Sequence, residues 1–338
     1  MRVDAFERVA RLVGNTPLVE ISQTASAARI LAKLEYYNPS GSVKDRAAKG
    51  MVEAALAGGA LAGRTILEAT SGNTGIALAM FGSALGLPVE LVMPANVTPE
   101  RKRIIANYGA RSLFTSNLEG TDGAQKKAAE LAAAHPDRYF YPDQYNNEHN
   151  WRAHYAGTGP EIWRQSGGQA THFVAGLGTS GTFIGTARFL RERGVRCIAV
   201  QPDNPIHGLE GWKHMPTARV PGIYDTAVAD EVLEADTETA YRFAIAAGRY
   251  LGYALSPSAA ANLWAALEVA RGNPGATVVT LFPDNSLKYL DDPYWENEEY
   301  VSEDPFRPRT ALPPVENEEY VSEDPFRPAD RAAASRER

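Results

Sequence analysis

The chain has 338 residues, 44% of them hydrophobic and 22% charged, which describes a globular protein long enough to form two lobes. The net charge of −7 and the lack of a basic stripe exclude a nucleic-acid-binding surface, and no apolar run is long enough to cross a membrane. Asp4 and Glu7 stand where a secretory signal would be apolar, so we expect a cytoplasmic protein.

Short apolar strands alternate with amphipathic helices between residues 13 and 290. Strands are predicted at 28–35, 65–69, 88–93, 110–115, 171–176, 195–201 and 276–282. Helices are predicted at 45–59, 74–86, 100–109, 122–135 and 182–194. This alternation is typical of an α/β fold with parallel sheets covered by helices, in which ligands bind where strands end and helices begin.

The first such loop contains Lys44, at the end of the stretch NPSGSVK. A lysine at a helix start is often an ordinary solvated side chain. The alternative is a reactive amine that forms a Schiff base with a carbonyl compound or with pyridoxal phosphate. Gly41 permits a tight turn, and a helix that begins near Asp45 would disfavour the protonated amine.

The second loop is EATSGNTG, residues 68–75, which again leads from a strand into a helix. Its helix N-terminus suits a carboxylate, and the Asn73 amide can donate to an oxygen of a bound ring. An N-cap with a glycine turn would explain part of the string, although not all of it.

The third loop is GLGTSGT, residues 176–182, whose small residues open a helix and predict a phosphate site. The same stretch satisfies the dinucleotide fingerprint through Gly176, Gly178 and Gly181, with Asp203 as the ribose-binding acid. A nicotinamide-dependent oxidoreductase is therefore an alternative, but it leaves Lys44 without a role.

The C-terminal segment, residues 291–338, differs from the rest because it holds 14 acidic side chains against 6 arginines. It contains ENEEYVSEDPFRP twice, at 296–308 and 316–328. We predict a disordered acidic tail, because so few aliphatic residues cannot build a core. Alternatively, the repeat is a short motif anchored by Tyr, Val and Phe that docks on a partner or folds back over the active site.

Several strings resemble the cysteine synthase and cystathionine β-synthase group of fold-type II pyridoxal-phosphate enzymes. They are LVGNTPLV (12–19), NPSGSVKDR (38–46), SGNTG (71–75), GTGPEIW (157–163) and GLGTSGT (176–182). The resemblance covers residues 5–290 and is nearest to the cysteine synthase M or O-phosphoserine sulfhydrylase type. It implies a cytoplasmic homodimer with two α/β/α lobes: a large cofactor-binding lobe (1–36 and 145–290) and a small mobile lobe (37–144).

The resemblance also implies roles for individual residues. Lys44 would hold pyridoxal 5′-phosphate covalently and later move the substrate Cα proton, and Asn73 would bind the 3′ oxygen of the cofactor. The implied phosphate cup comprises Gly178, Thr179, Ser180, Gly181 and Thr182. The implied substrate site comprises Thr70, Ser71, Gly72, Thr74 and Gln144.

Ser256 falls where the family pairs a serine with the pyridine nitrogen. A neutral hydroxyl there makes the ring a weaker electron sink, which favours prompt β-elimination over transamination. Pro257 and Ser258 depart from the family pattern, so Asp284 or Asn285 are alternatives near the ring nitrogen.

The expected reaction is the formation of L-cysteine from O-acetylserine or O-phosphoserine and a sulfur donor. A cation at Lys213 would suit the phosphorylated substrate, although a solvated loop lysine is equally consistent. The donor is left open among sulfide, thiosulfate and a sulfur-carrier protein. A cystathionine β-synthase-type condensation of serine with homocysteine and a non-catalytic scaffold are further alternatives.

Cysteine and histidine usage predicts no metal site. The one cysteine, Cys197, lies on a β-type apolar run and is expected to be a buried structural thiol. The histidines are scattered without the spacing of metal ligands.

Overall fold

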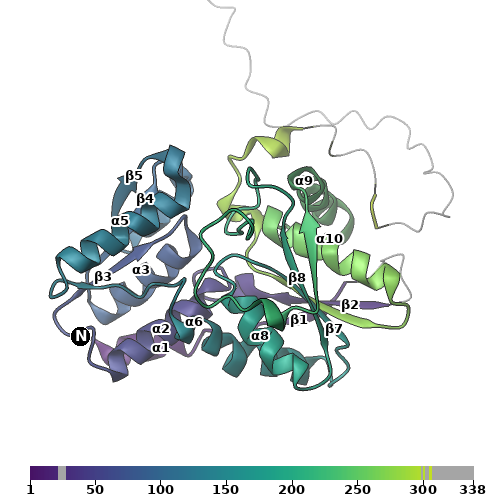
Figure 1. Cartoon of the computed structure of the whole chain (residues 1–338), viewed down its shortest axis with the longest axis horizontal. Coiled ribbons are helices and arrows are strands. Elements are labelled where there is room, and N and C mark those ends of the chain that lie inside the picture. The colour runs from purple at the N-terminus through teal and green to yellow at the C-terminus, as the bar shows by residue number, and fades with distance from the viewer. Residues whose placement is uncertain (22–27, 298–299, 301–303, 307–338) are drawn as a thin grey trace, which may run out of the picture.

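Two sheets, each covered by helices, form two lobes that lie side by side (Figure 1). The computed structural model describes residues 1–21, 28–297, 300 and 304–306. The predicted α/β class with mostly parallel strands is confirmed, since among the described strands only the pairing of β1 with β2 is antiparallel.

The larger sheet has six strands in the order β1-β2-β10-β7-β8-β9. Its strands are β1 (Leu18–Glu20), β2 (Arg29–Leu34), β7 (His172–Gly176), β8 (Arg196–Pro202), β9 (Glu231–Ala235) and β10 (Thr277–Phe282). Helices α9 (Thr237–Ala246) and α10 (Pro257–Gly272) bury their alanine-rich sides against one face. Helices α7 (Gly159–Gln165) and α8 (Gly181–Arg191) pack on the core of the other face.

The smaller sheet has four parallel strands in the order β5-β4-β3-β6. They are β3 (Thr65–Ala69), β4 (Val89–Pro94), β5 (Arg111–Thr115) and β6 (Tyr139–Phe140). One core joins this sheet to α1 (Val3–Ala10), α2 (Lys44–Ala57), α3 (Asn73–Leu85) and α4 (Pro99–Asn107). A second core joins it to α5 (Gly120–Ala134).

Helix α6 (Glu148–Ala153) connects the lobes, because it packs against α2 on one side and α8 on the other. It continues into a π-helical turn, His154–Thr158. Strands β3–β6 fall within the predicted small lobe, whereas the first helix, α1, packs on α3 of that lobe through Phe6 and Ala10. The predicted lobe boundaries and the mobility of the small lobe stay predictions.

All seven predicted strands are present, with ends displaced by a residue or so. Strands β1, β6 and β9 were not predicted, because they have two to five residues each and carry too little alternation to stand out. Cys197 is buried on β8 as predicted, and burial raises the pKa of its thiol to about 12.

Packed structure extends past residue 290, where the acidic tail was predicted to begin. Tyr294, in the 3-10 turn Pro293–Glu296, is buried, and so is Phe306. Both belong to the core that lies between α10 and the larger sheet. Residues 307–338, which include the second repeat, lie outside the described residues.

Within the described ranges, no helix is long and apolar enough to span a membrane.

Candidate functional site

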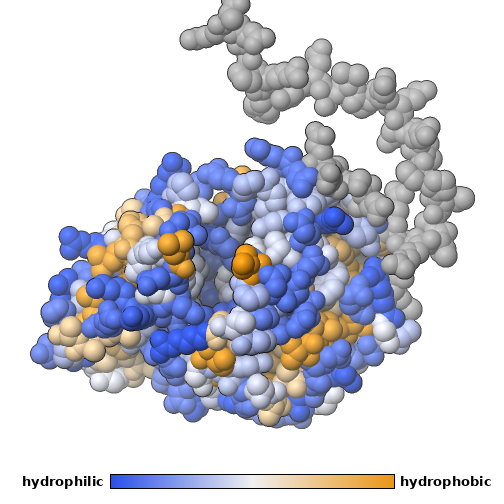
Figure 2. All heavy atoms as spheres, turned by 45° about the horizontal axis from the view of Figure 1, so that its top comes forward, coloured by the Kyte–Doolittle hydropathy of each residue, from blue (hydrophilic) through white to orange (hydrophobic). Residues whose placement is uncertain are grey.

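A cavity lies between the lobes where the predicted loops meet, and the molecular surface is hollowed there (Figure 2). The predicted residues that line it are Lys44, Thr70, Ser71, Gly72, Asn73, Thr74, Gln144 and Thr179. These predicted residues come from the start of α2, the β3–α3 loop, the segment after β6 and the β7–α8 loop. The cavity therefore combines the carboxyl ends of strands from both sheets, as expected for an α/β fold.

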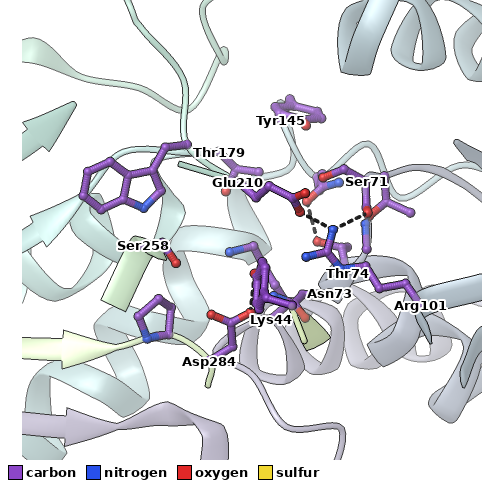
Figure 3. Close-up of a pocket in the computed structure, with 17 residues that line it drawn as sticks. Lys44, Ser71, Asn73, Thr74, Arg101, Tyr145, Thr179, Glu210, Ser258 and Asp284 are labelled. Atoms are coloured by element: carbon purple, nitrogen blue, oxygen red, sulfur yellow. Dashed lines mark hydrogen bonds and ion pairs between the residues drawn. The ribbon is translucent and has the colours of Figure 1, made fainter. Parts of the chain in front are cut away.

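Lys44 is the first residue of α2, and its side chain points into the cavity (Figure 3). Gly41 makes the preceding turn with a φ of 81°, in the left-handed region that favours glycine. Among the described residues, none accepts a hydrogen bond from Lys44 Nζ. Burial lowers the pKa of this amine, and the nearby Lys288 ammonium lowers it further, whereas the Asp284 carboxylate opposes the shift. The arrangement favours a neutral, nucleophilic amine.

Asn73 stands beside Lys44 at the first position of α3 (Figure 3). Its amide nitrogen donates to Asp284 Oδ2 at 2.8 Å, and its amide oxygen accepts from Lys288 Nζ at 2.8 Å. Lys288 also donates to the carbonyl oxygens of Ser40 and Gly41, at 3.1 Å each. The lysine therefore links the turn before Lys44 to the start of α3, and the two charged partners fix the orientation of the amide.

The β3–α3 loop is held by its own hydroxyl groups. Thr70 Oγ1 accepts hydrogen bonds from the backbone amides of Gly72 and Gly75, at 3.0 and 3.3 Å. Thr74 Oγ1 donates to Gln144 Oε1 at 2.7 Å, and Gln144 Nε2 donates to the carbonyl of Ala69 at 2.8 Å. These bonds present the N-terminus of α3, with its partial positive charge, to the cavity.

The β7–α8 loop has the close packing of a cradle for a small anion. A Cβ added to Gly178 would lie 2.0 Å from the carbonyl oxygen of Gly211, and one added to Gly181 would lie 2.0 Å from Asn150 Oδ1. Ser180 adopts a left-handed φ of 69°, and its hydroxyl is buried without a hydrogen-bond partner among the described residues. A phosphate at the start of α8 would supply that partner.

Thr179 and Thr182 are positioned by side chains from α6 and the turn after it. Asn150 Nδ2 donates to Thr179 Oγ1 at 3.0 Å, and Thr182 Oγ1 lies 3.3 Å from His154 Nε2. Burial lowers the pKa of His154 to about 3, so its ring stays neutral and serves as a hydrogen-bonding support. Together with Lys44 and Asn73, these groups fit a phosphate-bearing cofactor that carries an aldehyde.

Ser256 is buried at the N-cap of α10, where its hydroxyl accepts from the amide of Ala259 at 3.2 Å. Its Oγ also lies 3.2 Å from Ser258 Oγ. Of these two serines, Ser258 lines the cavity. The two hydroxyl groups therefore form one connected pair at the cavity, and Ser258 is its member on the lining.

Lys213 is not among the residues that line the cavity, and its Nζ donates to Asp122 Oδ1 at 2.8 Å. The ammonium also lies 5.3 Å from the centre of the Tyr145 ring. Asp203, the acid of the nicotinamide alternative, is exposed and accepts a hydrogen bond from the neighbouring Asn204 at 2.8 Å. Neither side chain belongs to the cavity lining.

Arg101 and Glu210 line the cavity but were missed by the sequence analysis (Figure 3). Arg101, on α4, is buried, and it forms an ion pair with the half-exposed Glu210 of the β8–β9 segment. Its Nε is buried without a partner among the described residues. In the sequence, Arg101 is one of several charged residues on an amphipathic helix, so no pattern distinguishes it from a solvated arginine.

Glu68, immediately before the cavity-lining loop, was also missed. Its carboxyl oxygens accept from the amides of Ala69 and Gln144, at 2.9 and 3.2 Å. Burial raises the pKa of this carboxyl to about 8. Its position at the end of a buried strand was the available indication, because charged residues there are rare without a role.

Residues 9–284 match the model of the family described as pyridoxal-phosphate dependent enzyme. The cysteine synthase of Aquifex aeolicus (strain VF5) is 48% identical over 299 residues, which is 85% of this chain and 91% of that protein. A crystal structure of the cysteine synthase from Entamoeba histolytica has a TM-score of 0.80 at 33% identity and covers 87% of this chain and 95% of its own. The O-acetylserine-dependent cystathionine β-synthase of Helicobacter pylori has a TM-score of 0.78 at 33% identity, with 83% and 96% covered.

Proposed function

Because the chain belongs to the pyridoxal-phosphate-dependent enzyme family, we propose that it makes L-cysteine by β-replacement from an activated serine and a sulfur donor. The observation that carries this proposal is the meeting of three groups at one cavity. They are the unpaired Lys44 amine, the carboxylate-binding start of α3 and the anion cradle at the start of α8. Similarity to curated cysteine synthases supports the same reaction, and the nicotinamide alternative has no comparable support.

When bound, the cofactor supplies the electron sink that stabilises negative charge at the substrate Cα. Lys44 holds the cofactor through its Nζ, and the same amine takes the proton from Cα and returns it at the end of the reaction. The Asn73 amide nitrogen, which also donates to Asp284 Oδ2, would donate to the ring oxygen, and the residues around Ser180 would bind the phosphate. The start of α3, with Ser71 and Thr74, holds the substrate carboxylate.

The hydroxyl groups of Ser256 and Ser258 are the candidates to face the ring nitrogen. Neither group is an acid, so the ring nitrogen is not forced to carry a proton. This arrangement favours rapid loss of the β-substituent over a long-lived carbanion, which suits replacement chemistry.

The β-substituent leaves as an anion, whether it is acetate or phosphate, and Arg101 is the cation at the cavity that could receive it. In the structure Arg101 is paired with Glu210. Because the Glu210 side chain is half-exposed, it can move into solvent when an anion binds to Arg101. A phosphorylated serine carries its charge before departure, so it depends more strongly on this arginine than an acetylated serine does. Lys213 is less suited to the task because Asp122 holds it.

Kinetics with both activated serines would test the leaving group. We expect Arg101→Gln to lower kcat/KM for O-phosphoserine roughly ten-fold more than for O-acetylserine, in keeping with a charge-assisted hydrogen bond. Lys213→Ala is the matched control and should affect the two substrates equally. If Arg101→Gln lowered kcat/KM equally for the two substrates, or if Lys213→Ala selectively lowered it for O-phosphoserine, Arg101 would not be the residue that binds the leaving phosphate.

Cystathionine formation is a second candidate function, favoured by the similarity to the O-acetylserine-dependent enzyme of H. pylori. The two reactions share every residue described above and differ in the thiol that attacks. Assays with sulfide, thiosulfate or homocysteine, each offered with each activated serine, would identify the attacking thiol.

We also propose that the protein is a homodimer and that it uses a sulfur-carrier protein. Light scattering would test the first proposal, and assays with a thiocarboxylated carrier would test the second.

The core proposal can be tested by spectroscopy and labelling. The holoenzyme should be yellow, lose its colour with borohydride and carry the reduced cofactor on the peptide that contains Lys44. Adding an activated serine should shift the absorption band, and adding sulfide should restore it with release of cysteine. A colourless protein, or a cofactor label on another lysine, would refute the proposal.

A further inference from the structure

Of the first copy of the tail repeat (296–308), the structure describes residues 296, 297, 300 and 304–306, and the aromatic side chains among them pack on α9 of the large lobe. The copy begins at the end of the yellow-green 3-10 turn Pro293–Glu296 in Figure 1. The surface beneath it, here called the α9 face, consists of Glu238, Tyr241, Arg242 and Phe243 of α9 and Arg271 of α10. The described residues of the copy contact this face through two aromatic anchors, Tyr300 and Phe306.

Phe306 is the deeper anchor. Its side chain is 2% exposed and meets Phe243 edge to face, with ring centres 5.6 Å apart. The carbonyl oxygen of the preceding Pro305 accepts a hydrogen bond from Arg271 at 3.5 Å. Burying a phenylalanine ring of this kind is the largest single favourable contribution that so short a peptide can make.

Tyr300 is the second anchor, six residues earlier in the chain. Its ring centre lies 6.2 Å from that of Tyr241, and the Arg242 guanidinium lies 5.8 Å from the same ring. The Tyr300 hydroxyl donates to the carboxylate of Glu238. These contacts use a tyrosine, a phenylalanine and one backbone carbonyl, all of which the second copy also possesses.

We propose that the second copy, residues 316–328, is an alternative occupant of the α9 face. It repeats the thirteen residues of the first copy without a change, so Tyr320, Pro325 and Phe326 stand at the spacing of Tyr300, Pro305 and Phe306. The two identical copies therefore compete for one binding surface, and one copy can replace the other on it. The displaced copy is then available for the α9 face of a second molecule of the same chain.

The first copy has the advantage in the intact chain, for a physical reason. It begins at the 3-10 turn fixed by Tyr294 and Trp295, whereas Tyr320 lies 20 residues further along the chain. Loop closure becomes less probable with roughly the three-halves power of tether length, so we expect an about ten-fold preference for the first copy. Loss of the first pair of anchors should transfer occupancy to the second.

Photo-crosslinking in the full-length holoenzyme tests this exchange. Benzoylphenylalanine replaces Phe326, either in the otherwise unchanged chain or together with Tyr300→Ala and Phe306→Ala. We expect weak crosslinking to α9 in the first protein and a roughly ten-fold higher yield in the second. The mass of the product separates attachment within one chain from attachment between two, and either result supports the proposal. A yield that does not rise when the first anchors are removed overturns it.

Hydrogen exchange of α9 provides an independent measurement. With the first anchors removed, α9 should keep most of its protection, because the second copy covers it. Removal of all four anchors, with Tyr320→Ala and Phe326→Ala added, should accelerate exchange in α9 but not in β10. Phe114→Ala, at an exposed ring on β5 in the other lobe, is the matched control. Equal acceleration in the two-anchor and four-anchor variants would overturn the proposal.

Discussion

Lys44 and Arg46 stand two residues apart on α2 and meet opposite surroundings. Arg46 is buried, and its guanidinium donates to Glu35 at 2.7 and 2.8 Å and to both oxygens of Glu161 at 2.8 Å. Lys33, also buried, lies 2.7 Å from Glu161. Lys44 has a carboxylate and an ammonium nearby but no direct acceptor among the described residues.

The helix itself causes this difference. Residues two positions apart point to nearly opposite sides of an α-helix, so one side chain enters the cavity while the other enters the protein interior. The charges around Arg46 tie the start of α2 to the segment after β2 and to α7. One side chain is fully paired and fixes the helix, and this leaves the other unpaired in a defined place for chemistry.

The largest expected effect is that of Lys44→Ala. Without its amine the chain loses the cofactor linkage and the proton carrier, so we expect cysteine formation to fall by at least about 10³-fold. Folding should be unaffected, since Lys44 forms no ion pair within the part of the chain that the structure describes. Lys49→Ala on the same helix removes an amine 3.8 Å from Glu53 and should keep full activity. Steady-state assays and thermal unfolding of both variants would check this, and an active Lys44→Ala would contradict it.

Arg46→Met should produce the next largest effect, but on stability. It leaves the buried carboxylate of Glu35 without its principal partner, and breaking a buried ion pair typically costs about 3–5 kcal/mol. Urea unfolding measures this loss. Arg152→Met, which removes an exposed pair with Glu148, should change the free energy of unfolding by less than about 1 kcal/mol. Similar values for the two variants would mean that the buried network contributes no more than a surface pair.

The comparison also explains how far the sequence could predict this site. Lys44, Asn73 and the loop around Ser180 were predictable, because backbone turns and helix starts leave local patterns of glycine and small hydroxyl residues. The pairing of Arg46 was not, since its partners Glu35 and Glu161 belong to other elements, 11 and 115 residues away in the chain. Tertiary pairing leaves no periodic pattern in a sequence.

Arg101 and Lys213 illustrate the same limit. Both are basic residues near the site, and only the tertiary contacts reveal that Arg101 lines the cavity while Lys213 binds Asp122. The α/β alternation predicted the order of the long strands because it is a local property. The short strands β1, β6 and β9 could not be predicted, because they form mainly through pairing with neighbours in the sheet.

Acid should weaken the ion pairs that Arg46 and Lys33 form with Glu161. The resulting loss in the free energy of unfolding should be smaller than that caused by Arg46→Met. Burial acts to raise the pKa of Glu161, but the hydrogen bonds and charge of Arg46 and the hydrogen bond to Lys33 together lower it to about 2 from an ordinary value of 4.5. A carboxylate with a lowered pKa stabilises the fold above pH 4.5 and loses that contribution as the pH falls towards 2, on the order of 3 kcal/mol. Glu161→Gln should flatten the pH dependence of unfolding in this window, whereas the exposed Glu148→Gln should not. An unchanged slope in Glu161→Gln would assign acid sensitivity to other carboxylates.

The smallest expected effect is a shift in the pH dependence of the Lys44 amine. The Asp284 carboxylate raises the pKa of the Lys44 amine, against the stronger lowering by burial. Asp284→Asn removes the carboxylate that raises this pKa, so the amine should stay neutral at lower pH and capture added pyridoxal phosphate at that pH. Borohydride trapping of the cofactor on Lys44, followed across pH, should place the midpoint lower in Asp284→Asn than in the unchanged protein. Because Asn73 bonds both Asp284 and Lys288, Asn73→Ala is the control for loss of these hydrogen bonds with the Asp284 charge kept. An equal shift in both variants would trace the effect to the position of Asn73, and a shift confined to Asp284→Asn would trace it to the carboxylate charge.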